Sequence, residues 1–359
     1  MNGTPDDRGE DAASDPLEDA YARALALEKA GEADAAAAAW REVLALDPED
    51  HGGAAVRLAS LRRGEAPDRA PPAYVATLFD QHAAAFEEIL VGQLGYRAPT
   101  RLAEMLAEVM APDAEPSLLD LGCGTGLMAA ALDAALPGER GHSTGLDLSE
   151  EMLGEADERG LYDALYVGDA VAFLLAPAED EDGDVSGPWD LITAADVLPY
   201  LGGLEDLFAG AFAQLVPGGL MAISTETLPE DAFPPSGWTV GPHQRFHHAA
   251  SYLRRALTEA GFEIAAQGGG RRRPPASPIQ IRLRNAFTAS AVASGDCTGR
   301  RWPPGRTWNS PFGSLPAIFS MVLAGAVSSA SAARHSTGWV TFSRSSRRLK
   351  VVRQRTTSR

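Results

Sequence analysis

Cysteine is scarce in this chain, with only Cys123 and Cys297 among 359 residues. Two cysteines cannot build a disulfide framework or, on their own, a metal cluster, so we expect neither and no bound metal. Long hydrophobic runs are also rare: the longest, near residues 316–333, contains serines and glycines and makes a poor membrane span. Residues 1–15 are polar and acidic and lack the features of a secretory signal. These absences predict a cytoplasmic protein without a membrane segment.

Basic residues are scarce before Gly268. Of the 31 lysines and arginines, 16 lie at or after that glycine, together with a single acid, Asp296. The preceding 267 residues therefore hold 15 basic and 48 acidic side chains, a net charge of −33. A body this acidic repels phosphate backbones, which disfavours nucleic acid as a partner.

Short apolar segments alternate with helical patterns through the middle of the chain. We predict strands at residues 117–121, 141–146, 164–167, 189–194, 219–226 and 262–267, and helices at residues 127–136, 150–159, 170–175, 204–215 and 249–260. This alternation predicts an α/β fold with a mostly parallel sheet and helices on both faces.

The segment before that region is helical and rich in alanine. Gly31, Trp40 and the Asp47–Pro48 pair lie as in the second half of a tetratricopeptide repeat. About one and a half such units are visible, and a free-standing solenoid needs roughly three. The segment is therefore either an adaptor that binds a protein partner or, as we favour, a helical cap docked on the main domain.

Three alternating glycines, Gly122, Gly124 and Gly126, join the strand at residues 117–121 to the next helix. Such a turn lets a ligand approach bare backbone N–H groups at the positive end of a helix. Asp147, which closes the following strand, is placed to accept hydrogen bonds from both hydroxyls of a ribose. The pattern predicts a nucleoside site.

Further polar residues follow neighbouring strands. Asp120 lies two residues before the first glycine, and Asp169 and Ala170 follow the third strand. The carboxylate of Asp169 can accept a hydrogen bond from the exocyclic amine of a nucleoside base, while the adjacent N–H can donate one to a ring nitrogen of that base. Asp169 has a second interpretation as a helix N-cap, and Met152 as an ordinary core residue.

Together with Pro217-Gly218-Gly219, these motifs resemble the class I S-adenosylmethionine-dependent methyltransferases across about residues 116–267. The resemblance implies a Rossmann-like sheet with S-adenosylmethionine over the glycine loop, Asp147 at the ribose, Asp169 at the adenine amino group and Met152 against the adenosine. The cofactor-binding residues so implied are Asp120, Gly122, Gly124, Gly126, Asp147, Met152, Asp169 and Ala170. With its leader, the whole chain is similar to predicted methyltransferases that carry a tetratricopeptide-like N-terminus.

The chain thus divides into five predicted parts. These are a disordered leader at residues 1–15, a helical tetratricopeptide-like segment at 16–65, cap helices at 73–112, a cofactor-binding core at 113–267 and a basic tail at 268–359. The cap includes one amphipathic helix over residues 74–86 that is similar to the helix closing over the cofactor in family members with small-molecule acceptors.

Two other functions stay open. A Rossmann-type NAD(P)-dependent oxidoreductase usually has its third glycine three residues after the second, whereas Gly124 and Gly126 are two apart. A non-catalytic adaptor would use the helical leader and a degenerate nucleoside fold. The intact glycine and carboxylate set favours a methyltransferase acting on a small molecule.

Catalytic candidates lie where substrates sit in open α/β folds, beyond the ends of the strands. Asp196 and Tyr200 follow the strand at residues 189–194. In a cluster expected to form a loop, His247 is a candidate base and Arg245 a candidate ligand for an anionic acceptor. His82 is a further candidate substrate-binding residue, expected to face the cofactor. The acceptor itself is not identified.

The tail departs from the family pattern. Family members close the sheet with a final antiparallel strand, but a Gly-, Arg- and Pro-rich sequence begins at Gly268 instead. We favour a shifted reading frame as its origin over a basic anion-binding tail, and expect it to be largely disordered. The missing strand is expected at residues 278–284 or 338–342.

Overall fold

The structure, a computed structural model, describes residues 15–111, 114–136, 138, 140–176, 187–269, 318–325, 339–342 and 351–354. A central sheet runs in the order β3-β2-β1-β4-β5-β7-β6. Its parallel strands are β1 (Leu118–Leu121), β2 (Ser143–Asp147), β3 (Ala164–Val167), β4 (Trp189–Ala194) and β5 (Leu215–Glu226). The hairpin of β6 (Trp238–Val240) and β7 (Phe246–His248) continues from β5. The mostly parallel sheet is confirmed.

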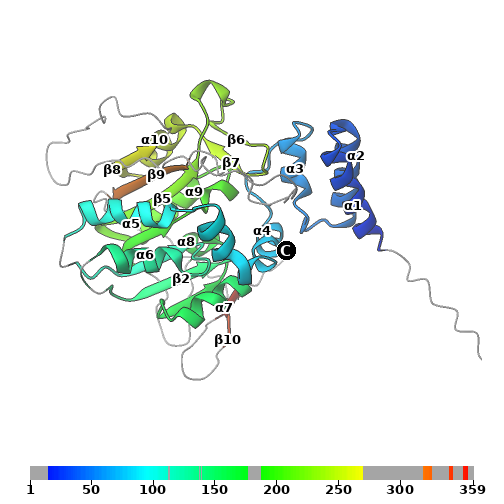
Figure 1. The fold of residues 1–359 in the computed structure, drawn as a ribbon. Coiled ribbons are helices and arrows are strands. Elements are labelled where there is room, and N and C mark those ends of the chain that lie inside the picture. The colour runs from blue at the N-terminus through cyan, green and yellow to red at the C-terminus, as the bar shows by residue number, and fades with distance from the viewer. Residues whose placement is uncertain are drawn as a thin grey trace, which may run out of the picture.

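Helices cover both faces of this sheet (Figure 1). They are α5 (Ala98–Val109), α6 (Leu127–Ala135), α7 (Glu150–Arg159), α8 (Ala170–Leu175), α9 (Glu205–Gln214) and α10 (Ala250–Glu259). Successive residues of a strand point to opposite faces. Leu119 accordingly packs in the core that α8, α9 and α10 share, and Leu118 in the core with α5 and α6. This packing on both sides fixes the strand ends that carry the site.

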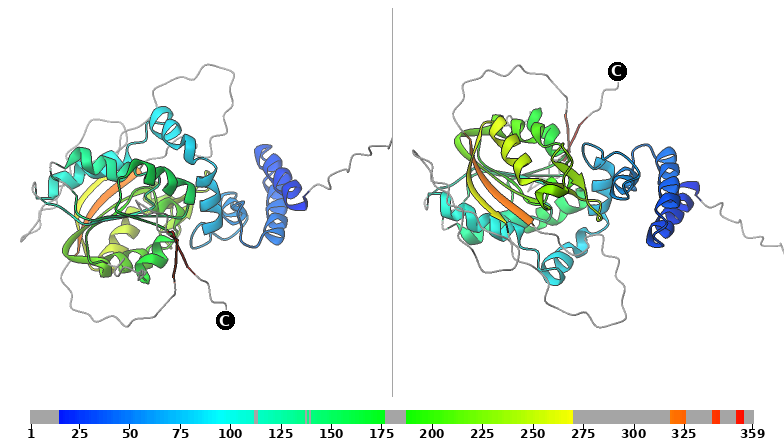
Figure 2. Two further views of the ribbon diagram at one scale, coloured as in Figure 1. Left: turned by 90° about the horizontal axis from the view of Figure 1, so that it is seen from below. Right: turned by 90° about the horizontal axis from the view of Figure 1, so that it is seen from above.

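A strand from the C-terminal region closes the sheet. β9 (Ile318–Gly325) lies between β5 and β8 (Phe262–Gly269) and is antiparallel to both. Figure 2 shows it in orange within the sheet. The prediction for this strand was wrong: β10 (Trp339–Phe342) pairs instead with β11 (Val351–Gln354) in a separate sheet, and residues 278–284 lie outside the described residues.

The error has a physical cause. Apolar and polar residues alternate over residues 278–284, a pattern that marks a strand with one face in water. The sequence of β9, IFSMVLAG, is instead almost continuously apolar, as is typical of strands enclosed within a sheet.

The leader is helical, as predicted. α1 (Pro16–Lys29) and α2 (Ala33–Leu46) form a hairpin around the buried Trp40, and α3 (Ala54–Ser60) follows. Figures 1 and 2 show the hairpin standing away from the sheet, with α3 between them. Val56 of α3 packs in a cluster with Val240 and Phe246 of the β6–β7 hairpin. The leader is thus docked through α3, while its kinship with tetratricopeptide repeats and a protein partner stay predictions.

The cap is less regular than predicted. The expected helix over residues 74–86 ends early: α4 (Pro72–Asp80) is followed by the short η1 (Ala83–Ala85) and the π-type η2 (Glu88–Gln93). Asp80 ends α4 and accepts a hydrogen bond of 2.5 Å from the Ser149 hydroxyl. The break therefore fastens the cap to the end of β2.

Two short 3-10 turns, η3 (Leu198–Tyr200) and η4 (Glu230–Ala232), complete the elements. Among the described residues, no helix has the length and apolarity needed to cross a membrane.

Candidate active site

The glycine loop opens directly onto a pocket. Gly122 and Gly124 have φ angles of +60° and +53°, which favour glycine. A Cβ added at Gly122 would lie 2.5 Å from Cγ2 of Val197, whereas at Gly124 it would have the Phe86 ring, 4.0 Å away, as its neighbour. Any side chain at Gly124 would therefore occupy pocket space, and a ligand gains direct access to the backbone.

Asp147 is fixed by backbone donors at the end of β2. Gly124 N–H donates to its Oδ2 over 2.8 Å, and Ser149 N–H to its Oδ1 over 2.9 Å. Burial raises the pKa of Asp147, with these N–H groups acting in the opposite direction. Because each carboxylate oxygen has a second lone pair, the residue can still accept from a ribose hydroxyl.

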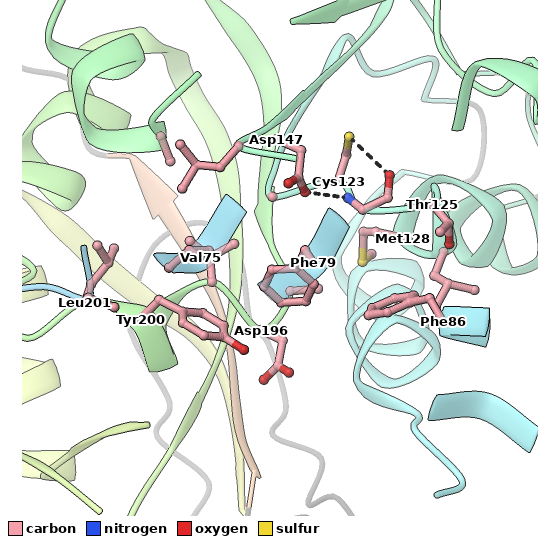
Figure 3. Close-up of a pocket in the computed structure, with 18 of the residues that line it drawn as sticks. Val75, Phe79, Phe86, Cys123, Thr125, Met128, Asp147, Asp196, Tyr200 and Leu201 are labelled. Atoms are coloured by element: carbon pink, nitrogen blue, oxygen red, sulfur yellow. Dashed lines mark hydrogen bonds between the residues drawn. The ribbon is translucent and has the colours of Figure 1, made fainter. Parts of the chain in front are cut away.

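The pocket joins the glycine loop to the ends of β4 and β7. It holds about 1050 Å³ of space, including its mouth to solvent. The lining residues are Arg69, Ala70, Pro72, Val75, Phe79, Phe86, Leu90, Tyr96, Pro99, Gly122, Cys123, Gly124, Thr125, Leu127, Met128, Asp147, Leu148, Gly168, Asp169, Ala170, Ala195, Asp196, Val197, Tyr200, Leu201 and Arg245. Figure 3 shows Asp147 and Cys123 on one side, Asp196 and the Tyr200 hydroxyl on the other, and the Phe79 ring between them in this view.

Asp169 combines both roles that the sequence allowed. Its Oδ1 accepts the Ala172 N–H over 2.9 Å as the N-cap of α8 and also pairs with Arg69 at 2.9 Å. Asp169 and Ala170 both line the pocket. The structure therefore brings together most of the predicted cofactor residues, whose contact with a cofactor stays a prediction.

Five predicted residues do not line the pocket. Asp120 is buried behind the loop, where it accepts hydrogen bonds of 2.6 Å from Tyr162 and Thr193, and burial raises its pKa to about 6. Gly126 is the N-cap of α6, and Met152 packs in the core under the cap. His82 lies 2.7 Å from the Leu78 carbonyl through Nδ1. These positions suit support of the site rather than direct contact.

His247 is the fifth of these residues, and the prediction that it lies in a loop was wrong. Its segment was expected to be a loop, but Phe246–His248 forms β7 and His247 is buried. Its Nε2 lies 3.3 Å from Glu226 Oε2 without hydrogen-bond geometry, and burial lowers its pKa. Alternating apolar residues are absent here, so the three-residue strand gave no periodic signal. His247 is placed away from the pocket, which argues against a role as base.

Arg245 binds three side chains at the far end of the pocket. Its Nη2 lies 2.8 Å from Asp196 Oδ1, its Nη1 lies 2.9 Å from the Tyr200 hydroxyl, and its Nε donates to Glu226 Oε1. Burial opposes its charge, but Asp196, Tyr200 and Glu226 hold the pKa of Arg245 well above its ordinary value. Burial also raises the pKa of Glu226 to about 7, against the attraction of Arg245.

Sequence reasoning missed several lining residues. Arg69 comes from the linker before the cap, and Tyr96 from the irregular part of the cap after η2. No local pattern marks these positions. Glu226, which holds Arg245 from behind the pocket, is the last residue of β5. Its position at the end of a predicted strand was the one feature of the sequence that could have marked Glu226 as a site residue.

A parallel sheet with a glycine loop after β1 and a carboxylate at the end of β2 is the arrangement that nucleoside-binding α/β proteins use. Residues 119–221 match a family described as a methyltransferase domain. The trans-aconitate 2-methyltransferase of Paracidovorax citrulli (strain AAC00-1) is 35% identical over 137 residues, 38% of this chain and 47% of that protein. The ubiquinone biosynthesis O-methyltransferase of Aromatoleum aromaticum is 36% identical over 109 residues, 30% of this chain and 43% of that protein. Residues 119–221 are therefore similar to a methyltransferase domain.

The chain spans less than half the length of these two curated relatives, at 47% and 43%. Among solved structures, the [4+2]-cyclase SpnF shares 26% identity over 47% of this chain and 60% of its own, with a TM-score of 0.39.

Proposed function

We propose that this protein transfers a methyl group from S-adenosylmethionine to a small-molecule acceptor. The observation that carries the proposal is one continuous pocket. It has the glycine loop and Asp147 on one side and Asp196 and Tyr200 on the other. A donor and an acceptor bound in such a pocket are held close together, which is the main requirement of a displacement reaction.

The residues present suit the donor. Gly124 leaves space against the loop, Asp147 offers lone pairs to the ribose, and Asp169 with the Ala170 N–H suits the adenine edge. When bound, S-adenosylmethionine supplies an electrophilic methyl group on a positively charged sulfur. Asp196 is the carboxylate at the acceptor side and is placed to take a proton from the acceptor.

Two further observations support a small acceptor. The relatives are named for trans-aconitate and for ubiquinone biosynthesis, both small-molecule chemistry. The pocket is roofed by the cap, which is tied to the glycine loop where Thr125 donates to Glu87 over 2.7 Å. Neither relative is named as an oxidoreductase or as an adaptor.

Isothermal titration with S-adenosylhomocysteine tests the proposal on the full chain. We expect binding that Asp147→Ala weakens strongly. The proposal would be contradicted if the unaltered protein did not bind S-adenosylhomocysteine and Asp147→Ala gave the same titration. Transfer of labelled methyl from S-adenosylmethionine across a metabolite panel then tests the acceptor.

A further inference from the structure

Aromatic rings line the pocket from the glycine loop, beside which Phe86 lies, to the acceptor side, where Tyr200 lies. Phe79 meets Phe86 edge-on with ring centroids 6.0 Å apart, and meets Tyr200 with centroids 5.5 Å apart. Tyr96 also lines the pocket and is buried. Rings in such edge-on arrangements favour a further planar ring as their neighbour. The shape and surface of this end therefore suit an aromatic acceptor (Figure 3).

The cation at this end is already neutralised. Each of the three nitrogens of Arg245 makes a hydrogen bond within the protein, to Asp196, Tyr200 and Glu226. Two of these partners are carboxylates, and Arg245 is buried between them. Its guanidinium supports the ends of β4 and β5 and has little charge left for a ligand. The expectation that Arg245 holds an anionic acceptor is therefore not favoured by this geometry.

The other cation in the pocket lining is engaged as well. Arg69 pairs with Asp169 at 2.9 Å, on the adenine side. Within the part of the chain that the structure describes, the lining thus holds two arginines against three carboxylates, Asp147, Asp169 and Asp196. A carboxylate on the acceptor would lose its water shell here without gaining an unpaired positive charge, which is costly.

We propose that the acceptor is an uncharged aromatic alcohol whose hydroxyl faces Asp196. The inference rests on the proposed methyltransferase function and names its substrate class. The hydroxyl oxygen forms the bond to the methyl carbon as the carbon–sulfur bond breaks with its electron pair going to sulfur. The hydroxyl proton goes to the carboxylate of Asp196 and from there to solvent.

A matched pair of acceptors tests the charge preference. 4-Methylcatechol and 3,4-dihydroxybenzoate share the ring and both hydroxyls and differ in a methyl group against a carboxylate. With the full chain, we expect kcat/KM at least about tenfold higher for 4-methylcatechol. We also expect 4-methylcatechol, and not the benzoate, to raise the melting temperature of the protein saturated with S-adenosylhomocysteine. This second readout reports binding without turnover.

A single substitution tests the role of Asp196. Asn adopts positive φ readily, so Asp196→Asn should keep the backbone at φ +67°. Because it releases one charge of Arg245, we expect the preference for 4-methylcatechol to shrink to about threefold or less. This preference is measured as binding to the protein saturated with S-adenosylhomocysteine, since Asp196 is also the proposed proton acceptor in turnover. Asp206→Asn makes the same chemical change at an exposed position in the first turn of α9 and should leave the preference unchanged.

The outcomes separate the two proposals. Failure of S-adenosylhomocysteine to bind overturns the methyltransferase function and this inference with it. Binding of S-adenosylhomocysteine with equal or better binding and turnover of the benzoate overturns the inference alone. So does an absence of both binding and turnover of 4-methylcatechol, or an unchanged preference in Asp196→Asn.

Discussion

The guanidinium of Arg69 donates a hydrogen bond of 2.9 Å to the same Asp169 oxygen that caps α8. The pair ties the linker before the cap to the loop after β3. Both side chains line the pocket at the side of Asp147. One carboxylate therefore has a helix-capping role and the ligand-binding role proposed above, and these two roles respond differently to substitution.

Replacing Asp169 by Ala and by Asn separates the roles. Ala removes the cap, which costs about 1 kcal/mol of stability, whereas Asn is an equally good cap. Since Asn loses the negative charge, both variants should bind S-adenosylhomocysteine about fivefold more weakly or worse. Urea denaturation and isothermal titration measure the two quantities. Wild-type affinity in Asp169→Asn would show that the carboxylate acts only as a cap.

Asp147→Ala should weaken binding of S-adenosylhomocysteine by about a hundredfold. Two hydrogen bonds from ribose hydroxyls to a carboxylate contribute about 1.5 kcal/mol each, or about 3 kcal/mol together. Asp157→Ala, on the exposed side of α7, is the matched control and should bind as the wild type does. A loss of less than about threefold in Asp147→Ala would contradict the ribose assignment.

Arg245→Met should destabilise the fold by about 3–5 kcal/mol in urea denaturation, because it leaves the buried Glu226 and the half-buried Asp196 without their cation. Adding Glu226→Gln should recover part of this loss, since an amide needs no counter-charge. Arg254→Met, at an exposed position of α10, should change stability by no more than about 0.5 kcal/mol. If the losses in unfolding free energy of Arg245→Met and Glu226→Gln simply add in the double variant, the two side chains are not coupled.

Stability should depend on pH through Glu226. Its pKa rises from 4.5 to about 7 in the fold, so the native state keeps the proton that the unfolded chain releases. Stability is then highest below pH 4.5 and falls as pH rises through about 7, by about 3 kcal/mol in total at 1.36 kcal/mol per pKa unit.

The measurement is the difference in unfolding free energy between wild type and Glu226→Gln at pH 5 and pH 8. Arg245, Asp196 and His247 face Glu226 and remain in both proteins. The lowered pKa of His247 acts in the opposite sense, since it costs stability as the pH falls, and it largely cancels in the difference. A wild-type advantage that grows from pH 5 to pH 8 would refute the assignment.

Removing β9 should prevent stable folding. A chain ending at Gly269 loses the strand that pairs with both β5 and β8, which exposes two unpaired edges. A chain ending at Gly325 keeps β9 and is the control. Circular dichroism melts should show a cooperative transition for the longer chain and a weaker one, or none, for the shorter. Equal melting temperatures would mean that β9 contributes nothing to stability.

The part of the fold that is local in sequence was predictable. The strands β1 to β4 and the helices α6 to α8 lie where apolar patterning and glycine positions indicated, because each packs its own periodic face into the core. β9 was not predictable in the same way. Its neighbours β5 and β8 end 92 and 49 residues before it begins, and its sequence has no alternation that assigns it to them.

By itself, the sequence located the residues that we propose for binding the methyl donor. The glycine loop, Asp147 and Asp169 each depend on a strand end and the turn that follows, so the residues and their spacing were sufficient to locate them. Only the tertiary structure decided the acceptor half. It places Arg245 between Asp196 and Glu226 and buries His247 in a strand, because the charge that a side chain offers a ligand depends on partners brought from distant segments.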